Sequence, residues 1–265
     1  MKFPNISKND LVSCFQNIGV SNSDLIYVAS YMPIFGHDPG ILPKTVSALQ
    51  KCVGSKGTIV MPTFNWSYCS SGKLDLNETP SQVGVLTEFF RTQEGVTRSE
   101  TPPWCTFASW GALSNEISAI RGTSPFGPDG ITQYLHDKNA KFTLIGCPYE
   151  DAVIHTHWLE EELQVPYRHW KRFLGTVTNG EKTTEDVSYM YARNLDIKAT
   201  IDTRAITTEF EKSGKVTVEK VGLGKIRCFP IMEYTKFLRP YIVNDPLFLL
   251  DTISRERYLR KIGDE

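Results

Sequence analysis

Residues 141–172, KFTLIGCPYEDAVIHTHWLEEELQVPYRHWKR, place a short apolar run directly before a cluster of ionisable side chains. Residues 142–145 predict a buried strand that ends at Gly146, and residues 151–163 predict a helix. A strand end that leads into a helix is a common location for a site in an α/β sheet. We therefore expect the chemistry of the protein in this stretch.

His157 and Glu160 are three residues apart, so a helix places them on one face, with His155 and Glu161 pointing elsewhere. Histidine titrates near neutral pH, and a carboxylate beside it fixes its tautomer and helps it accept a proton. The pattern indicates a general base. Spacing alone also allows an ordinary amphipathic helix with a solvated charge. A metal site is disfavoured, because the two histidines lack the i, i+4 spacing of a helical metal pair.

The composition describes an ordinary globular protein. The chain has 265 residues, 40% of them hydrophobic, and a formal net charge of −1, which gives no electrostatic basis for binding nucleic acid. We find no internal repeat or linker, so we expect one domain over residues 1–265. The N-terminus lacks an apolar run typical of a signal peptide, and no segment approaches the length of a membrane span. We expect a cytoplasmic protein without a membrane partner.

The six cysteines are scattered without a C-x-x-C pair, which predicts free thiols in a reducing compartment. Cys147 lies close to His157 in sequence, so a Cys/His acyl hydrolase is an alternative. It is disfavoured because Cys147 follows an apolar strand and the chain has no nucleophile elbow such as G-x-C-x-G there.

Local signals predict the remaining elements. Ser7 and Asp10 form a potential capping box at the start of a helix, and residues 175–187 are typical of a surface hairpin that turns at Asn179-Gly180. Charged residues and Gly214 within 209–222 extend this strand-and-hairpin region through the C-terminal half. The other expected segments are strands at 24–30, 58–61 and 104–110, a long loop at 67–80, and helices at 43–54, 81–92, 131–137, 231–238 and 246–261.

Short motifs follow one another along nearly the whole chain. They are V-G-V-L-T-E-F-F-R-T (83–92), V-T-R-S-E-T-P (96–102), F-A-S-W-G (107–111), S-P-F-G (124–127), and L-I-G (144–146) followed by H-W-L-E (157–160). In this order they resemble the aminoglycoside 3-N-acetyltransferase family. The resemblance implies an α/β fold, layered around a central mixed sheet flanked by helices, and direct transfer of an acyl group from acyl-coenzyme A to a sugar amine without a metal. A homodimer is compatible with it.

The resemblance also assigns residues. The histidine of the family's H-x-x-E motif is the general base and the glutamate holds it, which implies these roles for His157 and Glu160. Residues in the other motifs are candidates for binding coenzyme A. They are Ser30, Thr63, Arg98, Ser99 and Thr106.

Two departures from the family pattern concern the acceptor. Ala29 and Thr101 stand where antibiotic-modifying members tend to have histidines near the substrate cleft. Tyr167, Arg168 and Arg172 make the segment after the base aromatic and basic, which suits a pyrophosphate. We therefore expect a nucleotide-linked amino sugar as the acceptor, as in bacterial surface polysaccharide synthesis.

Two alternatives stay open. The run of three glutamates at 160–162 suits a polycation, which favours an aminoglycoside 3-N-acetyltransferase that confers antibiotic resistance. A non-catalytic protein that binds a sugar or nucleotide is the alternative from another class. It is disfavoured because His157 and Glu160 are both present.

Overall fold

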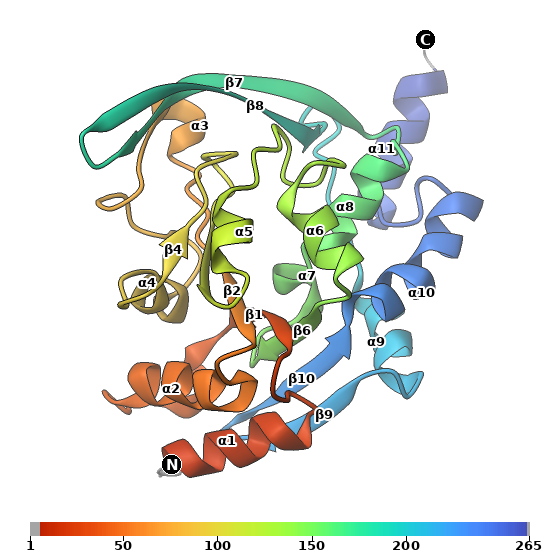
Figure 1. Ribbon diagram of the computed structural model, residues 1–265. Coiled ribbons are helices and arrows are strands. Elements are labelled where there is room, and N and C mark those ends of the chain that lie inside the picture. The colour runs from red at the N-terminus through yellow and green to blue at the C-terminus, as the bar shows by residue number, and fades with distance from the viewer. Residues whose placement is uncertain (1–5, 264–265) are drawn as a thin grey trace.

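A mixed sheet of seven strands forms the centre of the computed structural model, which describes residues 6–263 (Figure 1). In order across the sheet the strands are β4 (Thr97–Arg98), β5 (Phe107–Gly111), β2 (Thr58–Pro62), β1 (Leu25–Ser30), β6 (Lys141–Ile145), β10 (Gly224–Pro230) and β9 (Thr217–Val221). β1 lies parallel to β2 and to β6, and the other neighbours pair antiparallel. The expected layered α/β fold around a mixed sheet is confirmed.

Both faces of the sheet are buried. Successive side chains of a strand point to opposite faces, so each central strand contributes to two cores. Leu25, Tyr27 and Ala29 of β1 enter one hydrophobic core, and Ile26 and Val28 enter the other. The first core is shared with α5 (Ser114–Ser118), α6 (Ile131–Asp137), α7 (Tyr149–Ala152), α8 (His155–Glu162), α9 (Arg204–Lys212) and α10 (Ile231–Asn244). The second is shared with α1 (Lys8–Asn17), η1 (Met32–Phe35), α2 (Ile41–Val53) and α4 (Val85–Arg91).

A second sheet of three strands lies across the top of the molecule in Figure 1. Its antiparallel ribbon consists of β7 (Arg168–Asn179) and β8 (Lys182–Arg193), and β3 (Lys73–Asp75) pairs parallel with β7. The predicted hairpin is confirmed and is longer than expected at both ends. The ribbon therefore includes residues 168–172, which residues 163–167 connect to α8.

Several local signals are confirmed. The side chain of Ser7 caps α1 together with Asp10, and α6 spans the residues predicted for it. The charged stretch at 209–222 contains the end of α9 and the strand β9, and β9 forms a hairpin with β10 at the edge of the central sheet. α10 runs beyond the predicted end at residue 238.

Other predicted boundaries were wrong. The helix expected at 151–163 is two helices, α7 and α8, because the backbone at Val153 turns out of helical geometry (ψ 85°). The helix expected from Ser81 begins after Gly84, whose φ of 135° suits glycine alone. The loop expected at 67–80 contains α3 (Tyr68–Ser71) and β3, and the last helix, α11, spans Thr252–Gly263 instead of starting near residue 246. Within residues 6–263, no helix is long and apolar enough to cross a membrane.

Gly146→Ala tests how tightly β6 packs at its end. Gly146 has a φ of +73°, and an added Cβ would lie 2.8 Å from Ile34 Cγ2 and from the carbonyl oxygen of Tyr31. Gly180 has a φ of +61° with no atom within 4 Å of an added Cβ, so Gly180→Ala is the matched control. In urea denaturation, we expect the control to lose about 1–2 kcal/mol from left-handed strain. Gly146→Ala should lose roughly 1–3 kcal/mol more from overpacking. Equal losses would contradict the packing described here.

Candidate active site

The carboxylate of Glu160 is fully buried and accepts hydrogen bonds from three side chains. His157 Nδ1 lies 2.6 Å and Arg168 Nη2 lies 2.7 Å from Oε2, and the Tyr167 hydroxyl donates to Oε1 at 2.8 Å. Burial raises the pKa of Glu160, but the hydrogen bonds and electrostatic interactions with His157 and Arg168 outweigh it and hold the pKa below the ordinary value. The site therefore contains an ionised carboxylate in a largely apolar core.

The chain brings these partners together within one turn after α8. His157 and Glu160 lie one helical turn apart, as predicted, and Gln164 adopts a left-handed conformation (φ 49°) that reverses the chain. Tyr167 directly precedes β7 and Arg168 begins it, and Arg168 Nη1 donates to the carbonyl of Tyr191 on β8 at 3.0 Å. Helix and ribbon are thereby joined through Glu160.

The His157 ring has two unlike nitrogens. Nδ1 donates its proton to the Glu160 carboxylate, so Nε2 carries the lone pair. The side chain of His157 is 39% exposed while that of Glu160 is 0% exposed. The ring of Phe126 contacts the imidazole edge to face at 5.7 Å between centroids. This is the geometry of a general base, held on one side and accessible on the other.

Of the two neighbours predicted to point elsewhere, His155 does so. His155 is buried and its Nε2 pairs with the carbonyl of Thr132 at 2.9 Å, and burial lowers its pKa to about 3. It is a neutral core residue. Glu161 faces the loop that contains Ser124. In the part of the chain that the structure describes, no three His, Cys, Asp or Glu side chains gather in a group that could hold a metal ion.

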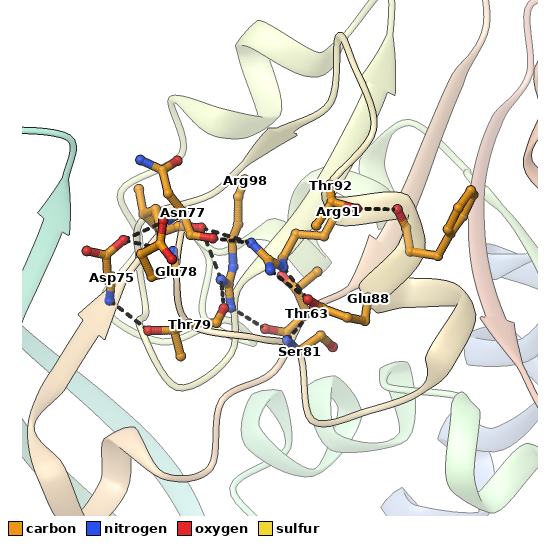
Figure 2. Close-up of polar contacts among 12 residues, drawn as sticks. Thr63, Asp75, Asn77, Glu78, Thr79, Ser81, Glu88, Arg91, Thr92 and Arg98 are labelled. Atoms are coloured by element: carbon orange, nitrogen blue, oxygen red, sulfur yellow. Dashed lines mark hydrogen bonds and ion pairs between the residues drawn. The ribbon is translucent and has the colours of Figure 1, made fainter.

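Arg98, predicted to bind coenzyme A, donates hydrogen bonds to groups of the protein itself (Figure 2). Its guanidinium contacts Thr106 Oγ1 at 3.0 Å and the carbonyls of Thr63 at 2.9 Å, Thr79 at 2.6 Å and Leu76 at 3.2 Å. Burial lowers the pKa of Arg98 to about 10. Arg98 thus joins the loop that follows β3 to the end of β2.

The other residues predicted to bind coenzyme A differ in whether their hydroxyl groups already form hydrogen bonds within the protein. Ser99 Oγ accepts from the backbone of Phe107, and the hydroxyls of Thr63 and Thr106 bond to each other in the core. Ser30 ends β1 and is half-buried, and within residues 6–263 its hydroxyl has no hydrogen-bond partner. Ser30 is therefore the member of this set with a hydroxyl available to a ligand. The coenzyme A role of the others stays a prediction.

The three residues predicted to bind the acceptor also differ in availability. Tyr167 is 1% exposed and bonded to Glu160, and Arg168 is paired with the same carboxylate. Arg172 is exposed on β7. Two of the three side chains that suggested a pyrophosphate site are thus occupied in holding Glu160.

Cys147 is buried, and burial raises the pKa of its thiol to about 12. A thiol with this pKa is a poor nucleophile at neutral pH. The backbone carbonyl oxygen of Cys147, and not its thiol, accepts a hydrogen bond from Arg227 at 3.3 Å. This environment weakens the Cys/His hydrolase alternative.

The sequence analysis missed a cavity of about 340 Å³ beside α8. Its lining includes Ser124, Asp129, Glu161, Trp170 and Tyr189. Two signals pointed towards it: the S-P-F-G motif contains Ser124, and the glutamate run at 160–162 contains Glu161. Neither signal shows that the two segments meet.

Comparison with known proteins identifies the family of this chain. A family model described as aminoglycoside 3-N-acetyltransferase matches residues 28–242. The chain belongs to this family. It is therefore an acyl-coenzyme A-dependent N-acyltransferase. Among relatives, it is 21% identical to the SPbeta prophage-derived aminoglycoside N(3')-acetyltransferase-like protein YokD of Bacillus subtilis (strain 168), over 90% of this chain and 93% of YokD.

A second relative is aminoglycoside N(3)-acetyltransferase IV of a Salmonella species, which is 27% identical over 60% of each chain. Among solved structures, the fold is similar to that of AAC-IIIb in its binary complex with CoASH. The TM-score is 0.78 and the identity is 19%, over 90% of this chain and 97% of that chain. At this identity the likeness establishes the fold.

Glu160→Gln tests whether the carboxylate orients and charges the base. The amide keeps the shape but removes the negative charge that stabilises the imidazolium, while Arg168 stays 3.1 Å from His157 Nδ1. We expect kcat to fall about 10- to 100-fold and the acidic limb of the pH–rate profile to move to lower pH. Glu162→Gln is the matched control, because Glu162 is ion-paired with Arg239 at the surface. An unmoved acidic limb would assign the orienting role to another group.

Proposed function

We propose that this protein transfers an acyl group from acyl-coenzyme A to an amine of an aminoglycoside-type, polycationic amino sugar, with His157 as the general base. The observation that carries the proposal is the pairing of the accessible His157 imidazole with the buried Glu160 carboxylate at 2.6 Å. The family to which the chain belongs supplies the reaction class.

The residues around His157 are sufficient for direct transfer of the acyl group from the thioester to the amine. A thioester is already activated, so the protein must position the amine and accept its proton. Nε2 of His157 takes that proton as the C–N bond forms, and the imidazolium returns it to the sulfur as the C–S bond breaks. Glu160 stabilises the imidazolium, and Tyr167 and Arg168 keep Glu160 ionised and in place. No protein nucleophile takes part.

Ser30 is the residue we propose for contact with the acyl donor. Its hydroxyl lies at the carboxyl end of β1 and is not used within residues 6–263. Beside it, Gly84 leaves open space: an added Cβ would have no atom nearer than the Ser30 carbonyl oxygen, at 3.9 Å. Backbone without a side chain suits the close approach of a ligand.

We infer the class of acceptor from the charged side chains that other residues of the protein do not already pair. A pyrophosphate needs arginine or lysine donors, and Arg168 is committed to Glu160. A polycation needs carboxylates, and the cavity beside α8 contains Glu161 and Asp129. A relative is named an aminoglycoside N(3)-acetyltransferase. These observations favour the aminoglycoside over the nucleotide-linked sugar preferred from sequence.

His157→Gln tests the base. The variant should lose turnover by about 10²- to 10⁴-fold, which is the usual contribution of a positioned base. Affinity for acyl-coenzyme A, measured by calorimetry, should not change, because the base acts on the acceptor. His169→Gln is the control, since His169 is exposed on β7. Near-normal kcat in His157→Gln would refute the assignment.

A panel of acceptors tests the substrate class. Release of free thiol from acetyl-coenzyme A is measured with three classes of acceptor. These are the aminoglycoside sisomicin, the simple amino sugar glucosamine, and UDP- and dTDP-linked amino sugars. We expect kcat/KM for sisomicin to exceed that for the nucleotide sugars at least about tenfold, since one misplaced charge contact costs roughly 1.5–3 kcal/mol. Arg172→Ala should leave the KM for sisomicin unchanged. A nucleotide-linked sugar used as well as sisomicin would restore the acceptor expected from sequence.

A further inference from the structure

The cavity of about 340 Å³ beside α8 is built from three parts of the chain. α8 contributes Glu161, the loop at 122–129 contributes Ser124 and Asp129, and the ribbon contributes Trp170 from β7 and Tyr189 from β8. The backbone N–H of Tyr189 donates to the carbonyl of Thr123 at 2.8 Å, which holds the ribbon against the loop.

Glu161 is a buried carboxylate at the wall of this cavity, with 4% of its surface exposed. Ser124 Oγ donates to its Oε2 at 2.7 Å, and a Cβ added at Gly127 would lie 3.3 Å from its Oε1, so the loop closes tightly on it. Within residues 6–263, no lysine, arginine or histidine forms an ion pair with Glu161. A buried carboxylate without a cation is costly, so the site favours a cationic ligand.

The cavity also has an aromatic wall. Trp170 is 49% exposed although it is large and apolar, and its ring lies edge to face with that of Tyr189 at 6.5 Å between centroids. The face of an indole ring attracts an ammonium group. A carboxylate, Asp129, lines the same cavity. Negative charge and aromatic surface together define a pocket for an organic ammonium.

The cavity lies next to the base through the S-P-F-G motif. The Phe126 ring contacts His157, and the Phe126 backbone N–H donates to Ser124 Oγ at 3.3 Å. One short segment therefore touches the base with one residue and the Glu161 carboxylate with another. A single acceptor molecule that carries several amines can present one amine to His157 and another to Glu161.

We propose that Glu161, with Trp170 and Tyr189, binds a second, non-reacting ammonium group of the acceptor and so selects polycationic amino sugars. The inference rests on the proposed function and deepens it by assigning the residue that determines acceptor specificity. Glu161 contacts the acceptor but takes no proton from the reacting amine.

The charges around Glu161 predict a pH dependence for acceptor binding. Burial raises the pKa of Glu161 to about 7, while the hydrogen bond from Ser124 and the positive charge of Arg168 lower it. His157 on the same helix, Asp129 on the loop and Tyr189 on the ribbon also surround this region. Because a cation favours the ionised carboxylate, affinity for the acceptor should fall as the pH drops below about 7.

Glu161→Gln tests the inference, with Glu162→Gln as the matched control one residue along the helix. The amide still accepts from Ser124 but has no charge. We expect the KM for sisomicin to rise about tenfold, with kcat within about threefold and the KM for acyl-coenzyme A unchanged. With glucosamine, which has a single amine, kcat/KM should change less than about threefold. Trp170→Leu, on the exposed ribbon, should also raise the KM for sisomicin.

Calorimetry without acyl donor separates the two proposals. Wild-type protein should bind sisomicin more tightly than Glu161→Gln at pH 8, and the difference should shrink at pH 6. If wild-type protein binds sisomicin in this way but does not acetylate it, the proposed function fails and the ammonium site stands. Equal affinities and equal KM values for wild type and Glu161→Gln would overturn the inference, as would a loss of kcat alone.

Discussion

The arrangement of the candidate active site depends on keeping the Glu160 carboxylate ionised while it is fully buried. Burial of one unpaired charge costs several kcal/mol, and the protein offsets this with a cation, an imidazole and a phenol. These partners come from α8 and from the start of β7. The cluster that positions His157, the proposed base, therefore also joins the core helix to the ribbon that lies over the molecule.

Three consecutive glutamates occupy three environments. Glu160 is buried and paired with two basic side chains, Glu161 is buried beside a cavity and accepts a hydrogen bond from Ser124, and Glu162 is half exposed and ion-paired with Arg239. Successive helical residues point about 100° apart, so each meets a different neighbour. The same type of side chain accordingly pairs with His157 in the core, lines a cavity or forms a surface ion pair.

The Arg98 network serves the scaffold. The Arg98 guanidinium donates to Thr63, directly after β2, and to the loop after β3, and so links strands that belong to different sheets. Figure 2 shows the neighbouring Arg91 in a similar position, paired with Glu88 and bonded to the carbonyl of Asn77. Polar residues that recur in motifs near a site can thus hold the loops of the site instead of touching a ligand.

The sequence by itself determined what depends on near neighbours. The capping box at Ser7, the helix at 131–137 and the shared face of His157 and Glu160 each follow from spacing within one helical repeat. The hairpin was also predicted, although its turn lies at residues 180–181, one position later than expected. The order of short motifs was enough to indicate the family, and with it the mixed sheet.

Only the tertiary structure decided which charged side chains are available to a ligand. Arg168 and Tyr167 suggested a pyrophosphate site because their partner, Glu160, could not be inferred from composition. The contact of Ser124 with Glu161 joins residues 37 positions apart, and the ribbon closes the cavity from a third segment. Burial and pairing depend on how distant segments pack, and these set the availability of each charge to a ligand.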